Sequence, residues 1–222
     1  DSAGVVVVNR GSIDQINLLD ESLTIATLSH CDVVASKQMV ATVKVIPFSA
    51  PGRVIKAAKK LAENSSYVIK VAPFTTKSVG LILTRLPGTK ESVLANTVKT
   101  VRARVETVGS VLKTSEILDH DETAIESAIK RMRSVGCDLI LISGASAIVD
   151  RRDVVPLGLE SAGGTIDHFG MPVDPGNLLL LGHLGDGDGR TPVLGLPGCA
   201  RSPKLNGFDW VLERLVANLE VT

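Results

Sequence analysis

The chain has 222 residues, of which 24 are basic and 24 acidic, 44% are apolar and 3% aromatic. This balance of charge and shortage of aromatic rings exclude a general nucleic-acid binder and a basic membrane-surface binder. Three widely spaced cysteines, with no CxxC pair, form no zinc motif. Such cysteine usage is typical of a reducing compartment and predicts a cytoplasmic protein, and no apolar run is long enough to span a bilayer.

The first third of the chain mixes strand and helix patterns. Apolar, β-rich stretches predict strands, and the polar or Pro-led stretches between them predict a helix or turn and a helix. The expected strands cover 4–8, 39–48 and 67–74, the helix or turn covers 10–21, and the helix covers 52–64. The polar run at 75–78 predicts a boundary between a smaller N-terminal α+β region at 1–76 and a second domain at 77–222. A start at aspartate directly before a strand indicates a piece of a longer protein.

Beyond the boundary, strands and helices alternate strictly. The expected strands cover 79–86, 108–118, 138–143 and 192–196, the expected helices cover 93–107, 119–136, 153–162 and 203–218, and a β-containing segment covers 165–184. The continuous apolar run at 138–143 is typical of a strand buried inside a parallel sheet. This alternation predicts an α/β fold, a three-layer αβα open and mostly parallel sheet. Ligands of such sheets bind beyond the carboxyl ends of the strands.

The first such strand end carries small residues followed by charged ones. Ser143, Gly144, Ala145 and Ser146 allow a close approach of backbone N–H groups to phosphate oxygens. Charge is available from the arginine pair that ends at Arg152. Asp150 and Asp153 offer carboxylates for a hydrated Mg²⁺. The alternative is an ordinary turn in which Asp153 caps the next helix.

The second strand end is the turn into the helix near residue 120. Asp119 and Asp121 flank His120, and at least one of them is expected to cap the helix. A functional role requires the other carboxylate to face the crevice. The four histidines have no metal-site spacing and are interpreted as structural or surface residues; they are His30, His120, His168 and His183.

The third strand end, at 195–210, combines a Pro-Gly turn with two cations. Backbone N–H groups beyond Gly198, together with Arg201, Ser202 and Lys204, are suited to one anion. Pro203 is expected at the first position of the closing helix. Cys199 has no histidine or asparagine near it in sequence, so we interpret it as a small buried thiol and not as a nucleophile.

In this order, the segments resemble the molybdopterin-binding domain of molybdenum-cofactor biosynthesis proteins, which molybdopterin adenylyltransferases and molybdotransferases share. The matching segments are SGA at 143–145, RRDVVP at 151–156, DPGN at 174–177, LPGCARS at 196–202 and HDE at 120–122. Segments at 40–48, 145–154 and 197–210 are similar to a subgroup often fused to a nucleotidyltransferase of the molybdopterin-guanine-dinucleotide type. Three features depart from the family pattern: Ala145 replaces a second glycine, Cys199-Ala200 replaces Asn/Gln-Pro, and the loop between Gly144 and Asp153 is one residue longer.

The resemblance implies a bacterial cytoplasmic protein of molybdenum-cofactor biosynthesis that binds molybdopterin as a small-molecule partner. It implies catalytic roles for Asp121 and Asp153, with Mg²⁺ on Asp153 and Asp150, and ATP or molybdate as further ligands. The implied pterin contacts are the 143–146 loop, Asp150, Arg152, Pro175, Gly176, Pro197, Gly198, Cys199, Arg201, Ser202 and Lys204. Family members of this kind form dimers or trimers.

Three activities stay open at this point. The first is adenylyl transfer to molybdopterin or molybdate insertion. The second is a pterin carrier, without catalysis of its own, that serves a fused or partner nucleotidyltransferase. The third is a nucleotide pyrophosphatase like the competence-associated proteins that share this domain.

Overall fold

The computed structural model describes residues 2–221, which divide into two compact units. One unit runs up to Phe74 and includes Ala217–Glu220, and the other contains Thr75–Val216 and Val221. The sequence placed this boundary after residue 76 and assigned Ala217–Glu220 to the second domain. The segment belongs to the first unit because Ala217 is buried in that unit's core and Leu219 packs against it.

The first unit is built from two small antiparallel sheets and two helices. Its elements are β1 (Gly4–Val8), α1 (Arg10–Asn17), β2 (Leu23–Thr27), β3 (Val33–Val34), β4 (Ala41–Val45), α2 (Gly52–Asn64) and β5 (Ile69–Pro73). Strand β1 lies between β3 and β5, and β2 pairs with β4. Apolar residues of α1, α2 and β2 form one buried cluster. Strands β2 and β3 lie in a stretch for which the sequence pattern predicted no element.

The second unit contains a six-stranded sheet in the order β7-β6-β8-β11-β10-β9. Its strands are β6 (Ser78–Arg85), β7 (Val111–Asp119), β8 (Leu139–Ser143), β9 (Gly164–Phe169), β10 (Leu180–Leu184) and β11 (Thr191–Gly195). Strands β7, β6, β8 and β11 are parallel, and β10 runs antiparallel to both of its neighbours, β11 and β9. Every residue of β8 is buried, as expected for a central strand with both faces covered. The predicted open, mostly parallel sheet is thus confirmed.

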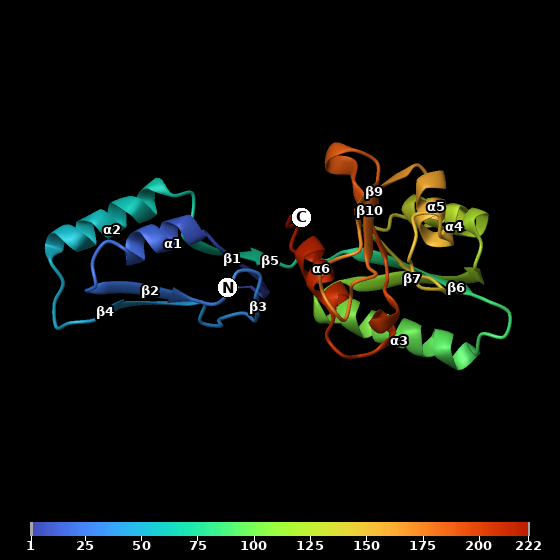
Figure 1. Cartoon of the computed structure of the whole chain (residues 1–222), viewed down its shortest axis with the longest axis horizontal. Coiled ribbons are helices and arrows are strands. Elements are labelled where there is room, and N and C mark those ends of the chain that lie inside the picture. The colour runs from blue at the N-terminus through green and yellow to red at the C-terminus, as the bar shows by residue number, and fades with distance from the viewer. Residues whose placement is uncertain (1, 222) are drawn as a thin grey trace. The chain divides into compact units, whose positions relative to one another are not determined.

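Helices cover both faces of this sheet, with α3 on one side and α4 and α5 on the other (Figure 1). The helices are α3 (Glu91–Thr107), α4 (Glu122–Ser134), α5 (Val154–Ser161) and α6 (Gly207–Val216), with short 3-10 turns η1 (Gly187–Gly189) and η2 (Gly198–Arg201). Alternate strand residues such as Ile82 and Ile140 pack with α4 and α5 in one buried cluster. Among the described residues, no helix has the length and apolar character needed to cross a membrane.

Candidate functional site

The carboxyl ends of the parallel strands meet at one edge of the sheet, and the loops that follow them are joined there by hydrogen bonds. Ala145 N donates to Thr84 Oγ1 at 2.7 Å, which ties the loop after β8 to the end of β6. Arg201 Nη2 donates to Gly144 O at 2.6 Å, which ties η2 to the same loop. His120 Nε2 lies 2.9 Å from Ser146 Oγ. The three loops singled out in the sequence therefore do converge.

A small cavity of about 70 Å³ lies between these loops and the start of α3. Its lining combines apolar side chains with hydroxyls and one guanidinium: Leu83, Thr84, Thr89, Val93, Leu94, Thr97, Ser143, Ala145 and Arg201. Ser143 is only 5% exposed and lines this cavity. Its hydroxyl can donate to, or accept from, a ligand oxygen or a water in the cavity.

Neighbouring atoms lie so close to this loop that they require a small residue at Gly144. A Cβ on Gly144 would stand 3.0 Å from Ser146 O and 3.2 Å from Val155 Cγ2. Ala145, which replaces the family's second glycine, does not adopt a positive φ. The alanine is therefore accommodated by the backbone, and its N–H remains engaged with Thr84.

The carboxylates proposed for Mg²⁺ are engaged within their own loop. Asp153 Oδ2 accepts from Val149 N at 2.7 Å and Asp150 N at 2.9 Å, and Asp150 Oδ1 accepts from Arg152 N at 2.7 Å. The Asp150 and Val149 N–H groups lower the pKa of Asp153, with a smaller contribution from nearby His120. Asp153 occupies the N-cap position of α5 without a side-chain cap bond.

In the part of the chain that the structure describes, no group of three or more His, Cys, Asp or Glu side chains is placed to hold a metal ion. Mg²⁺ requires near-octahedral oxygen coordination, and the two available carboxylates already accept backbone hydrogen bonds. Backbone N–H groups of their own loop therefore position both carboxylates.

The three polar residues in the turn before α4 make different contacts. Asp121 is the N-cap of α4, and its Oδ1 accepts from Ala124 N at 2.9 Å. Asp119 is exposed and pairs with Arg85 at 3.5 Å. The capping interpretation therefore accounts for Asp121 without a catalytic role. His120, which the sequence interpretation treated as structural or surface, is the residue that reaches the loop after β8.

His120 lies between two hydroxyl groups. Its Nδ1 is 2.8 Å from Thr84 Oγ1, and its Nε2 is 2.9 Å from Ser146 Oγ. Burial lowers the pKa of this imidazole, and the Asp153 carboxylate partly opposes the shift. The ring is therefore neutral at neutral pH. In the sequence, the position of His120 directly after a parallel strand was the feature that could have identified it as a site residue.

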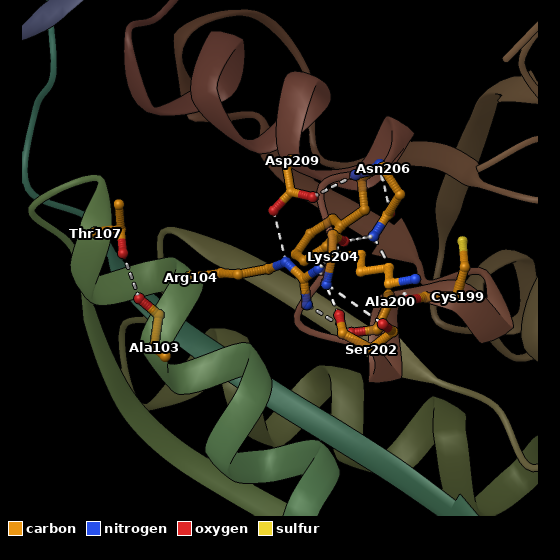
Figure 2. A network of polar contacts seen from close by, with 10 residues as sticks. Ala103, Arg104, Thr107, Cys199, Ala200, Ser202, Lys204, Asn206 and Asp209 are labelled. Atoms are coloured by element: carbon orange, nitrogen blue, oxygen red, sulfur yellow. Dashed lines mark hydrogen bonds and ion pairs between the residues drawn. The ribbon is translucent and has the colours of Figure 1, made fainter. Parts of the chain in front are cut away.

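Arg104 on α3 organises the loop between η2 and α6 (Figure 2). Its Nε donates to Asp209 Oδ1 at 2.5 Å, and its Nη atoms donate to three loop carbonyls, those of Ala200, Ser202 and Lys204, at 2.7 to 2.8 Å. The Arg104 and Asp209 side chains are only 9% and 11% exposed. Asp209 Oδ2 in turn accepts from Asn206 N at 2.8 Å.

The sequence reasoning did not single out Arg104. Its signal is its position on the buried stripe of α3, which includes Thr97, Val101 and Val105. A charged residue three positions after Val101 lies on that stripe and requires a buried partner.

This network also explains why the closing helix begins later than predicted. Pro203 was expected at its first position, but α6 begins at Gly207. The carbonyls of Ser202 and Lys204 point to Arg104 instead of accepting helical hydrogen bonds. Residues 202–204 therefore form a bend, and 205–206 are irregular, where a first helical turn was expected.

The remaining predicted contacts of this loop differ in what they offer a ligand. Pro197 and Gly198 open η2, and Ser202 Oγ accepts from Lys204 N at 3.3 Å. The Lys204 residue is exposed, and its backbone carbonyl is held by Arg104. Burial raises the pKa of the Cys199 thiol, despite nearby Arg104. A thiol with a raised pKa is a poor nucleophile, in agreement with the sequence interpretation.

The 174–176 turn packs against the start of α6. Asp174–Pro175 is a cis peptide bond, and Pro175 O accepts from Gly207 N at 2.9 Å. Gly176 has φ +133°, and a Cβ there would lie 2.7 Å from Gly207 N. The turn therefore supports the end of the third loop.

Farther along the first loop, Arg151 stacks over Phe169 and Arg152 is exposed.

Comparison with known proteins gives matches only among solved structures. No family model matches the chain, and no curated protein matches its sequence. The tungsten cofactor synthesizing protein MoaB from Pyrococcus furiosus superposes with a TM-score of 0.42 at 13% identity, over 65% of this chain and 91% of that one. A Corynebacterium diphtheriae structure, described as that of a molybdenum cofactor biosynthesis protein, superposes with a TM-score of 0.42 at 14% identity, over 64% of this chain and 93% of that one.

Proposed function

We propose that this chain binds molybdopterin in molybdenum-cofactor biosynthesis, with the pterin's phosphate at the cavity between the loops after β8 and β11. The observation that carries the proposal is the convergence of the loops after β6, β8 and β11 on this cavity, which Ser143 lines. Arg201 lines the same cavity and supplies the positive charge. The resemblance of the 143–145, 151–156 and 196–202 segments to the molybdopterin-binding family names the ligand.

The size of the cavity decides which part of the ligand it accepts. Pockets that enclose a whole drug-sized molecule measure about 300–1,000 Å³. A volume of about 70 Å³ suits one phosphate-sized group and not a fused ring system. The pterin ring is therefore expected to lie outside the cavity.

We further propose that the chain holds the pterin for a fused or partner nucleotidyltransferase and does not itself catalyse transfer. Adenylyl transfer or molybdate insertion with Mg²⁺ and ATP depends on carboxylates that are free to hold the metal. Here Asp121 caps a helix through one oxygen, and Asp150 and Asp153 each use one oxygen to accept backbone N–H groups, which leaves fewer oxygens for a metal. The same observation disfavours a metal-dependent nucleotide pyrophosphatase.

Isothermal titration of the full chain with molybdopterin tests the proposal, with a pterin that lacks the phosphate as the matched ligand control. We expect saturable binding of molybdopterin and at least tenfold weaker binding of the control, since a hydrogen bond to a charged group contributes about 1.5–3 kcal/mol. A folded protein that binds neither ligand, or binds both equally, contradicts it.

Catalysis is tested separately with the Asp153→Asn variant. If the chain is a carrier, wild type and variant both lack turnover with molybdopterin, ATP and Mg²⁺, while a transferase added in trans consumes the bound pterin. Turnover by the wild-type chain alone that is lost in Asp153→Asn establishes a catalyst and refutes the carrier role.

A further inference from the structure

Three side chains from three strand ends form a continuous hydrogen-bonded chain at the proposed site. Thr84 lies near the end of β6, His120 follows β7, and Ser146 belongs to the loop after β8. Thr84 Oγ1 is 2.8 Å from His120 Nδ1, and His120 Nε2 is 2.9 Å from Ser146 Oγ. The chain begins in the core, where Thr84 is 2% exposed, and ends at an exposed residue, Ser146.

The hydrogen bond from Ala145 sets the direction of this chain. A backbone N–H only donates, so Thr84 Oγ1 accepts from Ala145 N at 2.7 Å. The hydroxyl has one hydrogen of its own, and His120 Nδ1 is the acceptor that the described residues provide for it. A proton on Nδ1 would leave that hydrogen without a partner in a buried position, which costs about 1–3 kcal/mol. Thr84 therefore donates to Nδ1.

The direction then passes through the ring to Ser146. With Nδ1 as an acceptor, the neutral imidazole carries its proton on Nε2 and donates it to Ser146 Oγ. One lone pair of Ser146 Oγ is thereby occupied, and its own hydrogen is engaged by no described residue. The serine hydroxyl can thus donate its hydrogen from the exposed part of the loop.

We propose that His120 is a positioning residue that holds the Ser146 hydroxyl as a hydrogen-bond donor to a phosphate-type oxyanion. This inference deepens the proposed function and rests on it in placing an oxyanion at the loop of residues 143–146. A ligand oxygen that can only accept hydrogen bonds is favoured, because the Ser146 hydroxyl has a hydrogen to donate. His120 Nε2 cannot accept that hydrogen, since it carries a proton of its own. The Asp153 carboxylate acts electrostatically on the His120 imidazole, and its Oδ2 is held by two backbone N–H groups.

The direction of the hydrogen bonds from Thr84 to Ser146 is measured by nitrogen-15 NMR of the histidine side chains. The sample is the whole ligand-free protein at neutral pH. We expect His120 to be locked as the Nε2–H tautomer, whereas exposed His168 averages between tautomers and serves as the internal reference. Thr84→Ser keeps the donor and is expected to keep the tautomer. Thr84→Val removes the hydroxyl donor, and we expect His120 then to average between its two tautomers. A protonated Nδ1 on His120 in the wild-type chain overturns the inference.

The role of Ser146 is measured by titrating the same samples with inorganic phosphate. We expect the His120 Nε2 resonance to move with phosphate and this movement to be lost in Ser146→Ala, with Ser161→Ala as the control. No movement, or the same movement in Ser146→Ala, overturns the inference. Because neither measurement uses the pterin, a chain that fails to bind molybdopterin but passes both tests loses the proposed ligand and keeps the oxyanion donor.

Discussion

Replacement of Arg104 by methionine tests whether one buried guanidinium holds the third loop of the site. Methionine keeps much of the side-chain volume but removes all four hydrogen bonds that Arg104 makes to Asp209 and to three carbonyls. The Asp209 carboxylate, only 11% exposed, is then left with the Asn206 N–H as its partner. Loss of one partner of a buried ion pair costs about 3–5 kcal/mol, so we expect a loss of that size in the free energy of unfolding.

Two further substitutions separate the causes of that loss. Arg104→Lys keeps the charge but not the planar fork, and we expect it to recover less than half of the loss. Asp209→Asn, combined with Arg104→Met, is expected to cost less than the sum of the single changes, because both remove the same ion pair. Arg102→Met, on the exposed side of the same helix, is the matched control and should change stability by less than about 0.5 kcal/mol.

Urea unfolding followed by fluorescence is the appropriate assay. The single tryptophan, Trp210, lies beside Asp209 in α6 and is 40% exposed, so its emission reports on the second unit. The reasoning is refuted if Arg104→Met unfolds within about 1 kcal/mol of wild type or behaves like Arg102→Met.

Three further changes have defined outcomes. Burial, with a further contribution from Asp209, raises the pKa of Glu213 to about 7. Protonated Glu213 therefore contributes stability that is fully present below the pKa of the unfolded chain. This stability is lost as the pH rises through about 7. Glu213→Gln should therefore stabilise the chain at pH 8 by about 1–2 kcal/mol, after allowance for partial solvation, and not at pH 4; equal effects at both pH values contradict this. Gly176→Ala, with φ +133° and a backbone contact, should lower stability by about 2–4 kcal/mol in thermal melts, while Gly189→Ala, in open space, should not. Asp121→Ala should cost about 1 kcal/mol in urea unfolding and Asp121→Ser much less, and equal losses would argue against the capping role.

The sequence predicted the sheet well because its signals are local. The apolar run at 138–143 is a central strand, and helix α2 has the predicted bounds, since Pro51 and the apolar periodicity act within one helix length. Convergence of the loops also followed from local signals, because parallel strands end at one edge. The reversed direction of β10, which pairs antiparallel with β9 and β11, had no comparable signal in the mixed segment at 165–184.

The parts that the sequence did not predict depend on partners far apart in the chain. Arg104 contacts carbonyls that lie 96 to 100 residues away, and these contacts delay the start of α6. His120 was missed for the same reason, since its two hydroxyl partners belong to other strand ends. Ala217 joins the core of the first unit across almost the whole chain length.

The central claim, that the cavity at the carboxyl edge of the sheet receives the phosphate of molybdopterin, is tested most directly at Ser143. Titration calorimetry compares molybdopterin binding by wild type and by Ser143→Ala, a change that removes a hydroxyl lining the cavity and little volume. We predict that the variant binds about 10- to 100-fold more weakly, as expected for one hydrogen bond to a charged group. Equal affinity of the two folded proteins for molybdopterin would contradict the assignment.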